Sequence, residues 1–316
     1  MVDRTQLSAS KHIQQRTGTT FHLATRVLPR RVRHPTYVLY AFFRIADEVV
    51  DGTAYEDAAT KREAFERLRA GALGGKSADD PVLDAFAEVR ATHGIDPATV
   101  DAFLDAMERD VDQSRYPTHE DLEAYMDGSA TAVGEMMMSV MDVEDPETAR
   151  PHAKALAEAF QLTNFLRDVR EDVVDHGRIY LPLETLEANG ASPEDVENLR
   201  PTPEIERAVR TELHRTESLY RKGVAGIEYL PDDCQFAVLV SAVLYAEYHR
   251  AIRGRECDVL SRRPSVSRAR QIWVVARTAF AWKVSGDPES VFERVSAIPS
   301  GEGRDRAVHP ADPSTT

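Results

Sequence analysis

Residues 161–182 read QLTNFLRDVREDVVDHGRIYLP, a stretch that places two aspartates on one predicted helix. Asp168 and Asp172 are four residues apart, with Asn164 and Gln161 four and seven residues before Asp168. A helix with about 3.6 residues per turn brings these four side chains onto one face. Two carboxylates at this spacing repel each other by about 0.2–0.5 kcal/mol, so a cation bound between them would explain why both are present. Because carboxylates beside phosphate suit Mg²⁺, with Mn²⁺ as the second candidate, the stretch predicts a magnesium and phosphate site.

A second acidic pair lies far upstream, where residues 40–51 read YAFFRIADEVVD. Asp47 and Asp51 are again four residues apart, and apolar residues surround them on a helix predicted over 32–51. Two such pairs on otherwise apolar helices can face each other across a cavity and hold several Mg²⁺ ions around a diphosphate. Either pair alone also fits a solvated, acid-rich helix face, whereas both pairs together favour the metal site.

The combination of DEVVD, QLTNFLRDVRED and GRIYLP resembles the squalene/phytoene synthase family, over about residues 8–283. Within the family, the pattern is most similar to the archaeal and bacterial phytoene synthases. The resemblance implies an all-α fold, a single-domain isoprenoid synthase bundle of helices around a central cavity. It also implies a Mg²⁺-dependent prenyltransferase that condenses two geranylgeranyl diphosphates head to head. The reaction would pass through prephytoene diphosphate to phytoene, releasing diphosphate, as a step of carotenoid biosynthesis.

The resemblance further implies roles for individual residues. The implied metal ligands are Asp47, Asp51, Asn164, Asp168 and Asp172. Tyr180 joins the four aspartates in the implied catalytic set. The implied substrate-binding residues are Phe21, Tyr40, Arg44, Tyr125, Val133, Gln161, Asn164, Arg167, Tyr245 and Arg262. Spacing alone does not separate Tyr245 from Tyr248 or Arg262 from Arg263, and the loop at 17–20 departs from the family pattern, which leaves its contacts undefined.

Three alternatives remain open at this point. A squalene or dehydrosqualene synthase would act on two farnesyl diphosphates, and squalene synthases finish with NADPH. No nucleotide-binding motif such as GxGxxG occurs in the sequence, and a reaction that ends by proton loss needs none, so we expect no NADPH. An inactive helical scaffold of the same fold, or a helical regulatory module, would leave the paired acids without a purpose.

The composition limits the class of protein and its partners. The chain has 316 residues, of which 42% are hydrophobic, enough for a buried core. Its formal charge of −14 is opposite to the positive field that nucleic acid binding needs, and it suits a high-salt cytoplasm. No apolar run reaches about 18 residues, and no apolar signal core opens the chain. We therefore expect a cytoplasmic enzyme whose partner is a prenyl diphosphate, with at most peripheral contact to a membrane or to carotenoid-pathway enzymes and no obligate protein partner.

The hydrophobic pattern predicts helices throughout and no strands. Beyond the two motif helices, the ranges expected to be helical are 57–72, 80–93, 97–112, 120–141, 206–230, 232–253 and 266–283. The segment 120–141 contains several small residues, which predicts the close approach of either a neighbouring helix or a ligand chain. One helical domain is expected over 1–285, and 286–316 is expected to be a disordered tail because Gly, Pro, Ser and Thr dominate its end.

Overall fold

The computed structural model describes residues 25–52, 54–55, 57–74 and 80–299. These residues form helices and connecting loops, and the β structure among them is a single parallel bridge between Arg115 and Ile179. The prediction of an all-α fold is therefore confirmed. None of the described helices combines the length and the hydropathy needed to cross a bilayer.

The helices follow the predicted ranges closely. In chain order they are α3 (Arg30–Asp51), α4 (Ala58–Ala72), α5 (Pro81–His93), α6 (Pro97–Arg109), α7 (His119–Met126), η1 (Asp127–Thr131), α8 (Ala132–Met141), α9 (Pro146–His176), α10 (Leu183–Ala188), α11 (Pro193–Glu197), α12 (Pro203–Ala225), η2 (Gly226–Tyr229), α13 (Asp232–Arg253), α14 (Arg268–Ser285) and α15 (Pro288–Val295).

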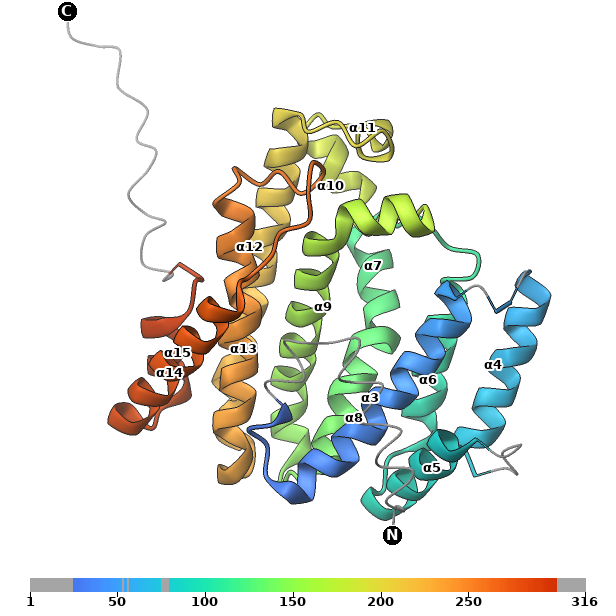
Figure 1. Ribbon diagram of the computed structural model, residues 1–316, viewed down its shortest axis with the longest axis vertical. Coiled ribbons are helices and arrows are strands. Elements are labelled where there is room, and N and C mark those ends of the chain that lie inside the picture. The colour runs from blue at the N-terminus through green and yellow to red at the C-terminus, as the bar shows by residue number, and fades with distance from the viewer. Residues whose placement is uncertain (1–24, 53, 56, 75–79, 300–316) are drawn as a thin grey trace, which may run out of the picture.

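Helix α9 carries the second acidic pair and runs through the middle of the bundle (Figure 1). It starts where the Asp145 side chain accepts a hydrogen bond from the backbone N–H of Thr148, with Pro146 at the first helical position. It ends at Gly177, whose φ of 65° lies in the left-handed region that glycine adopts easily. Helices α8, α12 and α13 pack around it, so its acidic face is fixed from several sides.

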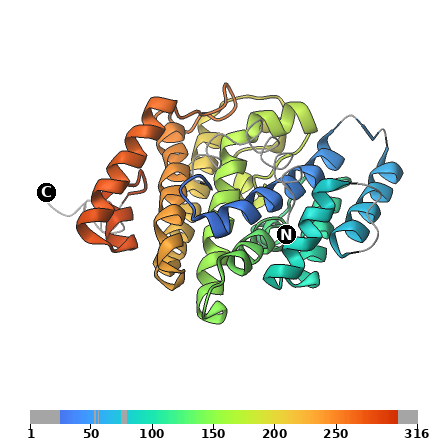
Figure 2. The ribbon, with the colours of Figure 1, turned by 60° about the horizontal axis from the view of Figure 1, so that its bottom comes forward.

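The described residues form three hydrophobic clusters, of which two are the larger. One hydrophobic cluster joins α3, α5, α6 and α8, with Phe42 stacked on Phe86 at a ring distance of 3.8 Å. A second joins α9, α12, α13, α14 and α15, with Tyr220 and Phe292 in contact. Figure 2 shows α14 and α15 gathered at one end of the molecule and α4 and α5 at the other. Helices α3, α8, α9 and α13 lie between these ends.

The small residues of segment 120–141 serve close helix packing. A Cβ atom on Gly128 would lie 2.4 Å from the backbone oxygen of Ala102 on α6. A Cβ on Gly134 would lie 3.3 Å from the Cβ of Ala157 on α9. The segment also contains the π-helical turn η1, which interrupts the predicted single helix. A neighbouring helix therefore accounts for Gly128, whereas Gly134 both packs against α9 and lines the cavity described below.

The structure differs from the predicted boundaries in two places. The first part of the segment 286–316, expected to be disordered, contains helix α15, which packs Val291, Phe292 and Val295 into the second cluster. The proline, serine and glycine residues of this segment suggested disorder, but Asp287 caps the start of an amphipathic helix. Helix α3 begins at Arg30, two residues before the predicted start at 32, so Pro35 lies inside it. The rest of the predicted tail, 300–316, lies outside the described residues.

Candidate active site

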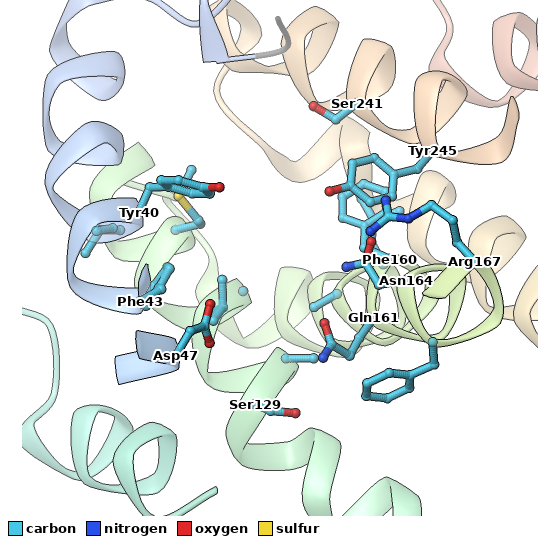
Figure 3. Close-up of a pocket in the computed structure, with 18 of the residues that line it drawn as sticks. Tyr40, Phe43, Asp47, Ser129, Phe160, Gln161, Asn164, Arg167, Ser241 and Tyr245 are labelled. Atoms are coloured by element: carbon cyan, nitrogen blue, oxygen red, sulfur yellow. The ribbon is translucent and has the colours of Figure 1, made fainter. Parts of the chain in front are cut away.

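A cavity of about 840 Å³ lies between α3, α8, α9 and α13, and all four motif aspartates line it. Figure 3 shows Tyr40 and Asp47 on α3 across the cavity from Gln161 and Asn164 on α9. Lining residues on α9 extend from Ala149 to His176, a length of roughly 40 Å at 1.5 Å per residue. The acids lie at the carboxyl ends of α3 and α9, and the lining earlier in both helices is mostly apolar. The cavity is therefore elongated, with an acidic end and an apolar end.

On the α3 side, the acids are already paired with cations. The Nη1 group of Arg44 donates a 3.0 Å hydrogen bond to Asp47, one helical turn away. The Nη1 group of Arg178 donates a 2.8 Å bond to Asp51, and the Nδ1 atom of His176 lies 3.5 Å from the same carboxylate. Arg178 and His176 follow from the end of α9, so Asp51 links the two acidic motifs.

On the α9 side, Asp168 is held between two guanidinium groups. Arg167 donates through Nε at 2.6 Å, and Arg263, from the loop before α14, donates through Nε at 2.8 Å. A second nitrogen of Arg263 lies 2.9 Å from Glu171. The guanidinium of Arg167 also stacks 4.9 Å above the ring of Tyr248, which fixes its direction. Positive charge is therefore concentrated beside the acids in a chain that is strongly negative as a whole.

The carboxyl groups influence each other's protonation. Burial, opposed by Arg44 and reinforced by Asp51, raises the pKa of Asp47 to about 6. Burial and the neighbouring Asp168 raise the pKa of Asp172 to about 8, and Asp51 on the other helix adds to this shift. The effect of Asp51 on Asp172 means that the two motifs interact electrostatically across the cavity.

A cation would fit this set of donors. The amide oxygen of Asn164 lines the cavity, is buried and has no hydrogen-bond partner. A buried oxygen without a partner is expected where a ligand binds. Within the described residues, no three His, Cys, Asp or Glu side chains surround a single point closely enough to form a complete metal cage. One or two carboxylates completed by substrate oxygens is the arrangement that suits Mg²⁺, which seldom occupies an all-protein cage.

Comparison with known proteins agrees with this geometry. The family model described as squalene/phytoene synthase matches residues 14–270 of the chain. The chain belongs to the squalene/phytoene synthase family. A phytoene synthase from Rhodobacter capsulatus is 34% identical over 270 residues, covering 84% of this chain and 79% of that protein. A 15-cis-phytoene synthase from Paracoccus sp. (strain N81106) is 32% identical over 273 residues, covering 82% and 88%.

Solved structures of the family have the same helical fold. A dehydrosqualene synthase in complex with a ligand superposes with a TM-score of 0.80 at 27% identity, over 89% of this chain and 98% of that one. A squalene synthase from Alicyclobacillus acidocaldarius has a TM-score of 0.71 at 25% identity, over 80% and 95%. The isoprenoid synthase fold expected from the motifs is thus confirmed.

Most of the residues singled out by the family motifs lie around the cavity. The lining includes the four aspartates together with Tyr40, Arg44, Tyr125, Val133, Gln161, Asn164, Arg167, Tyr180 and Tyr245. Tyr245 and its rival Tyr248 both line it, so the structure does not separate them. Arg262 does not line the cavity, whereas its rival Arg263 lines it and donates a hydrogen bond to Asp168. Phe21 and the loop at 17–20 lie outside the described residues.

The family motifs did not lead to Asp110, a buried carboxylate at the end of α6. Tyr125 donates a 2.6 Å hydrogen bond to its Oδ2 atom, Tyr180 donates to the same oxygen at 3.1 Å, and Tyr116 donates to Oδ1 at 3.3 Å. Burial raises the pKa of Asp110, and the phenol donors oppose that shift. Tyr125 and Tyr180 thus point their hydroxyl groups at a protein carboxylate, which fixes both rings in the cavity wall.

Arg178 connects this tyrosine cluster to the acidic end of the cavity. Its Nη2 group donates to the backbone oxygen of Asp110 at 3.0 Å, while its Nη1 group holds Asp51. The quoted motif GRIYLP contains both Arg178 and Tyr180, so the sequence carried a signal for this residue. Asp110 has no comparable signal, because its three partners are 6, 15 and 70 residues away in the chain.

Proposed function

We propose that this protein is a phytoene synthase, a prenyltransferase that condenses two geranylgeranyl diphosphates head to head with release of diphosphate. One observation carries the proposal: two aspartate pairs from distant parts of the chain line the same elongated cavity, beside arginines. The relatives from Rhodobacter capsulatus and Paracoccus sp., at 34% and 32% identity over most of the chain, are named phytoene synthases, which supports this activity over the squalene synthase alternative.

The residues that would hold magnesium are Asp47, Asp51, Asn164, Asp168 and Asp172. When bound there, Mg²⁺ would neutralise negative charge on the departing diphosphate, and Mn²⁺ has the same preference for oxygen ligands. The unpartnered amide oxygen of Asn164 supports its place in this set. Metal binding at the carboxylates would also free the arginines that now neutralise them.

The arginines at the acidic end would bind the diphosphate oxygens. Three arginines each donate a hydrogen bond to a cavity aspartate in this structure: Arg44, Arg167 and Arg263. The buried Nε group of Arg44 has no partner and adds a further donor. Charge-assisted hydrogen bonds from these groups to phosphate are stronger than neutral ones, so they would orient the diphosphate at this end. The prenyl chain would then lie along the apolar part of the cavity.

The apolar part of the cavity would exclude water from the carbocation that forms when diphosphate leaves. Phe43, Val133, Met137 and Phe160 are among the side chains that form this wall. The phenols of Tyr125 and Tyr180 have pKa values raised well above the ordinary range by burial and by Asp110, so they stay protonated. They would act as fixed hydrogen-bond donors and not as bases.

The decisive experiment supplies both candidate substrates. Purified protein with Mg²⁺ should convert geranylgeranyl diphosphate to a forty-carbon hydrocarbon without NADPH, detected by chromatography alongside released diphosphate. Product from farnesyl diphosphate alone would move the assignment to a dehydrosqualene or squalene synthase, and a need for NADPH would select the latter. No product from either substrate would favour the inactive scaffold.

We also infer where the protein acts. A prenyl substrate and a hydrocarbon product both carry long apolar chains, so a cytoplasmic enzyme would gain from peripheral contact with a lipid surface. The acidic composition supports a cytoplasm of high salt concentration, where such a chain stays soluble. Fractionation of cells with salt and detergent washes tests this location.

A further inference from the structure

Helix α14 exposes large apolar side chains that the fold does not need on its surface. Within the described residues, six large hydrophobic side chains are exposed, and four of them lie on this helix: Ile272 at 66%, Trp273 at 48%, Phe280 at 72% and Val284 at 66%. Exposed single apolar residues are ordinary, but a gathered set points to a partner. Figures 1 and 2 place α14 at one end of the molecule, away from the central helices.

The exposed residues form a stripe along one side of the helix. Ile272, Ala276, Phe280 and Val284 follow each other at steps of four residues, with Trp273 beside them, and all five are exposed. The opposite side of α14 packs Val274, Thr278 and Ala281 against the core. The helix therefore has an inner face that fixes it to the bundle and an outer apolar face, which we call the α14 stripe.

The chain segment that carries the stripe is basic, although two of its arginines, Arg263 and Arg270, are already paired with acids. Residues 259–286 contain six basic residues and no aspartate or glutamate, although the whole chain has a charge of −14. Within the part of the chain that the structure describes, Arg268 and Lys283 form no ion pair. The helical positions of Arg268 and Lys283 place both residues beside the stripe. Arg277 also lies beside it, with its guanidinium 5.3 Å from the centre of the Trp273 ring. An apolar stripe flanked by cations is complementary to an anionic lipid surface.

We propose that the α14 stripe is a membrane-docking surface that binds anionic lipid. Ile272, Trp273, Phe280 and Val284 would enter the boundary between headgroups and acyl chains. Trp273 suits that depth, because its ring is apolar and its N–H group needs a polar partner. Arg268 and Lys283 would contact lipid phosphates and add electrostatic attraction near the surface.

A second copy of the chain is a less suitable occupant of the stripe. A two-fold interface brings the same patch of each subunit together, so the cations beside one stripe would lie near the cations beside the other. No acidic residue of 259–286 would offset that repulsion. A lipid surface with negative charge has no such conflict.

The stripe is also close in the chain to the cavity. Arg263, Pro264, Ser265 and Val266 line the cavity and lead directly into α14, where Gln271 lines it as well. Docking would therefore hold one wall of the cavity near the lipid. The docking proposal itself does not depend on which prenyl diphosphate the cavity accepts, because lipid binding can be measured without substrate.

Tryptophan fluorescence reports on this surface directly. The chain has two tryptophans, Trp273 and Trp282, and both lie on α14. A Trp282→Phe variant leaves Trp273 as the single reporter. Vesicles of equimolar phosphatidylcholine and phosphatidylglycerol should shift its emission to shorter wavelength, whereas vesicles of phosphatidylcholine alone should have a much smaller effect. An unchanged spectrum with anionic vesicles would overturn the proposal.

A double variant, Ile272→Ser with Phe280→Ser, tests the apolar contribution by co-sedimentation with the same vesicles. Its partition coefficient should fall by about tenfold or more, since two large side chains no longer enter the interface. The matched control is Tyr229→Ser, which removes an exposed aromatic at 40% exposure from η2 and should leave binding unchanged. Circular dichroism of each variant checks that the fold is intact.

Further outcomes distinguish the alternatives. Arg268→Gln with Lys283→Gln should weaken binding to anionic vesicles and reduce its salt dependence, because the attraction is screened within about 3 Å at 1 M salt. Equal binding of the wild-type protein and the Ser double variant would overturn the proposal. So would light scattering that shows a dimer in wild type and a monomer in the Ser variant without vesicle binding, which would assign the stripe to a second copy.

Discussion

Three of the four cavity aspartates are paired with arginines, whereas Asp172 has no ion pair among the described side chains. Burial beside Asp168 raises the pKa of Asp172 to about 8, above the value of about 6 for Asp47. A carboxyl group with such a pKa keeps its proton at neutral pH until a cation displaces it. Asp172 is therefore the residue at which cation binding and proton release are most closely linked.

We predict that magnesium affinity rises with pH between about 6 and 8. Below its pKa, each protonated carboxyl must lose a proton before it binds the ion, so affinity should increase about tenfold per pH unit for each proton displaced. Calorimetric titration with MgCl₂ and inorganic diphosphate in two buffers of different ionisation enthalpy counts these protons. Asp172→Asn is the matched variant and should flatten the profile. An affinity that is independent of pH in the wild type would contradict the linkage.

Asp110 gives a second prediction at this scale. Asp110→Ala leaves the buried hydroxyls of Tyr116, Tyr125 and Tyr180 without their acceptor, and each unsatisfied group costs about 1–3 kcal/mol. We expect a large loss of unfolding free energy and of turnover. The control is Asp112→Ala, which removes an exposed partner of Arg62 and should change stability by less than about 1 kcal/mol. Equal melting temperatures for the two variants would contradict the role of the cluster.

At the same scale, sequence reasoning identified acids better than their partners. The aspartate pairs follow from helix spacing, which depends only on neighbours in the chain. Asp110 and the preference for Arg263 over Arg262 depend on contacts between residues as far as 95 positions apart, which no local pattern contains. The amide of Asn164 was found from its place on the same helix face as Asp168.

At the scale of elements, α9 and α12 approach closely because glycine lets them. A Cβ on Gly226 would lie 2.0 Å from the Cβ of His152, and one on Gly223 would lie 2.8 Å from the backbone nitrogen of Leu156. Residues Leu156, Gly223 and Gly226 line the cavity as well. The packing that fixes α9 therefore also shapes the wall of the cavity.

Replacing one of these glycines tests that packing. Gly226→Ala should destabilise the protein by about 1–3 kcal/mol, because the extra carbon overlaps the His152 side chain and forces the helices apart. The control is Gly254→Ala at the end of α13, where the nearest atom is 3.2 Å away and φ is right-handed. Thermal unfolding followed by circular dichroism measures both. Similar stability for the two variants would contradict the close approach of α9.

A buried polar cluster joins α12 to α13. Glu217 accepts hydrogen bonds from Arg253 and from Nδ1 of His249, which is 3.3 Å from its Oε1 atom. The side chains of Glu217 and His249 are fully buried, whereas that of Arg253 is partly exposed. Burial alone would raise the pKa of Glu217, but the bonds from His249 and Arg253 outweigh it and lower the pKa. Burial lowers the pKa of His249. Both groups therefore bind fewer protons in the folded state than in the unfolded state.

This cluster predicts a loss of stability in acid. A carboxyl group whose pKa is lowered by folding stabilises the protein at pH values above its unfolded pKa, and this stabilisation is lost as the pH falls. A histidine whose pKa is lowered by folding has the same effect, because acid favours the unfolded state, in which the histidine binds a proton more readily. Chemical unfolding between pH 7 and pH 4 should show this decline. Glu217→Gln should be less stable at pH 7 and have a shallower decline. A profile for this variant parallel to that of the wild type would contradict the assignment.

The elements were largely predictable, and the exceptions have physical causes. Helix α9 has a proline and an aspartate at its start and a glycine at its end, all local signals. Helix α15 was missed because its stability comes from tertiary packing. A helix this short is marginal alone and forms when Val291 and Phe292 pack against α12 and α13. The π-helical turn η1 has no pattern of its own.

At the scale of the molecule, the described residues form a bundle around a long cavity, with the exposed apolar stripe at one end. The charge distribution repeats this division, since the chain is acidic overall while residues 259–286 are basic. The catalytic proposal concerns the cavity and the membrane proposal concerns the stripe, and each can fail without the other. A chain ending at residue 299 should fold and turn over normally, because α15 is retained; loss of the helical signal would show that residues 300–316 are structural.

The central claim is that two aspartate pairs act together on one metal-bound diphosphate. Calorimetric binding of inorganic diphosphate in excess MgCl₂ to the wild type, Asp51→Asn, Asp172→Asn and the double variant tests it most directly. Each single variant should lower affinity at least tenfold, and the double variant should lose less than the sum of the two, with a coupling of about 1 kcal/mol or more. Strictly additive losses, or single variants that bind as well as the wild type, would contradict the shared site.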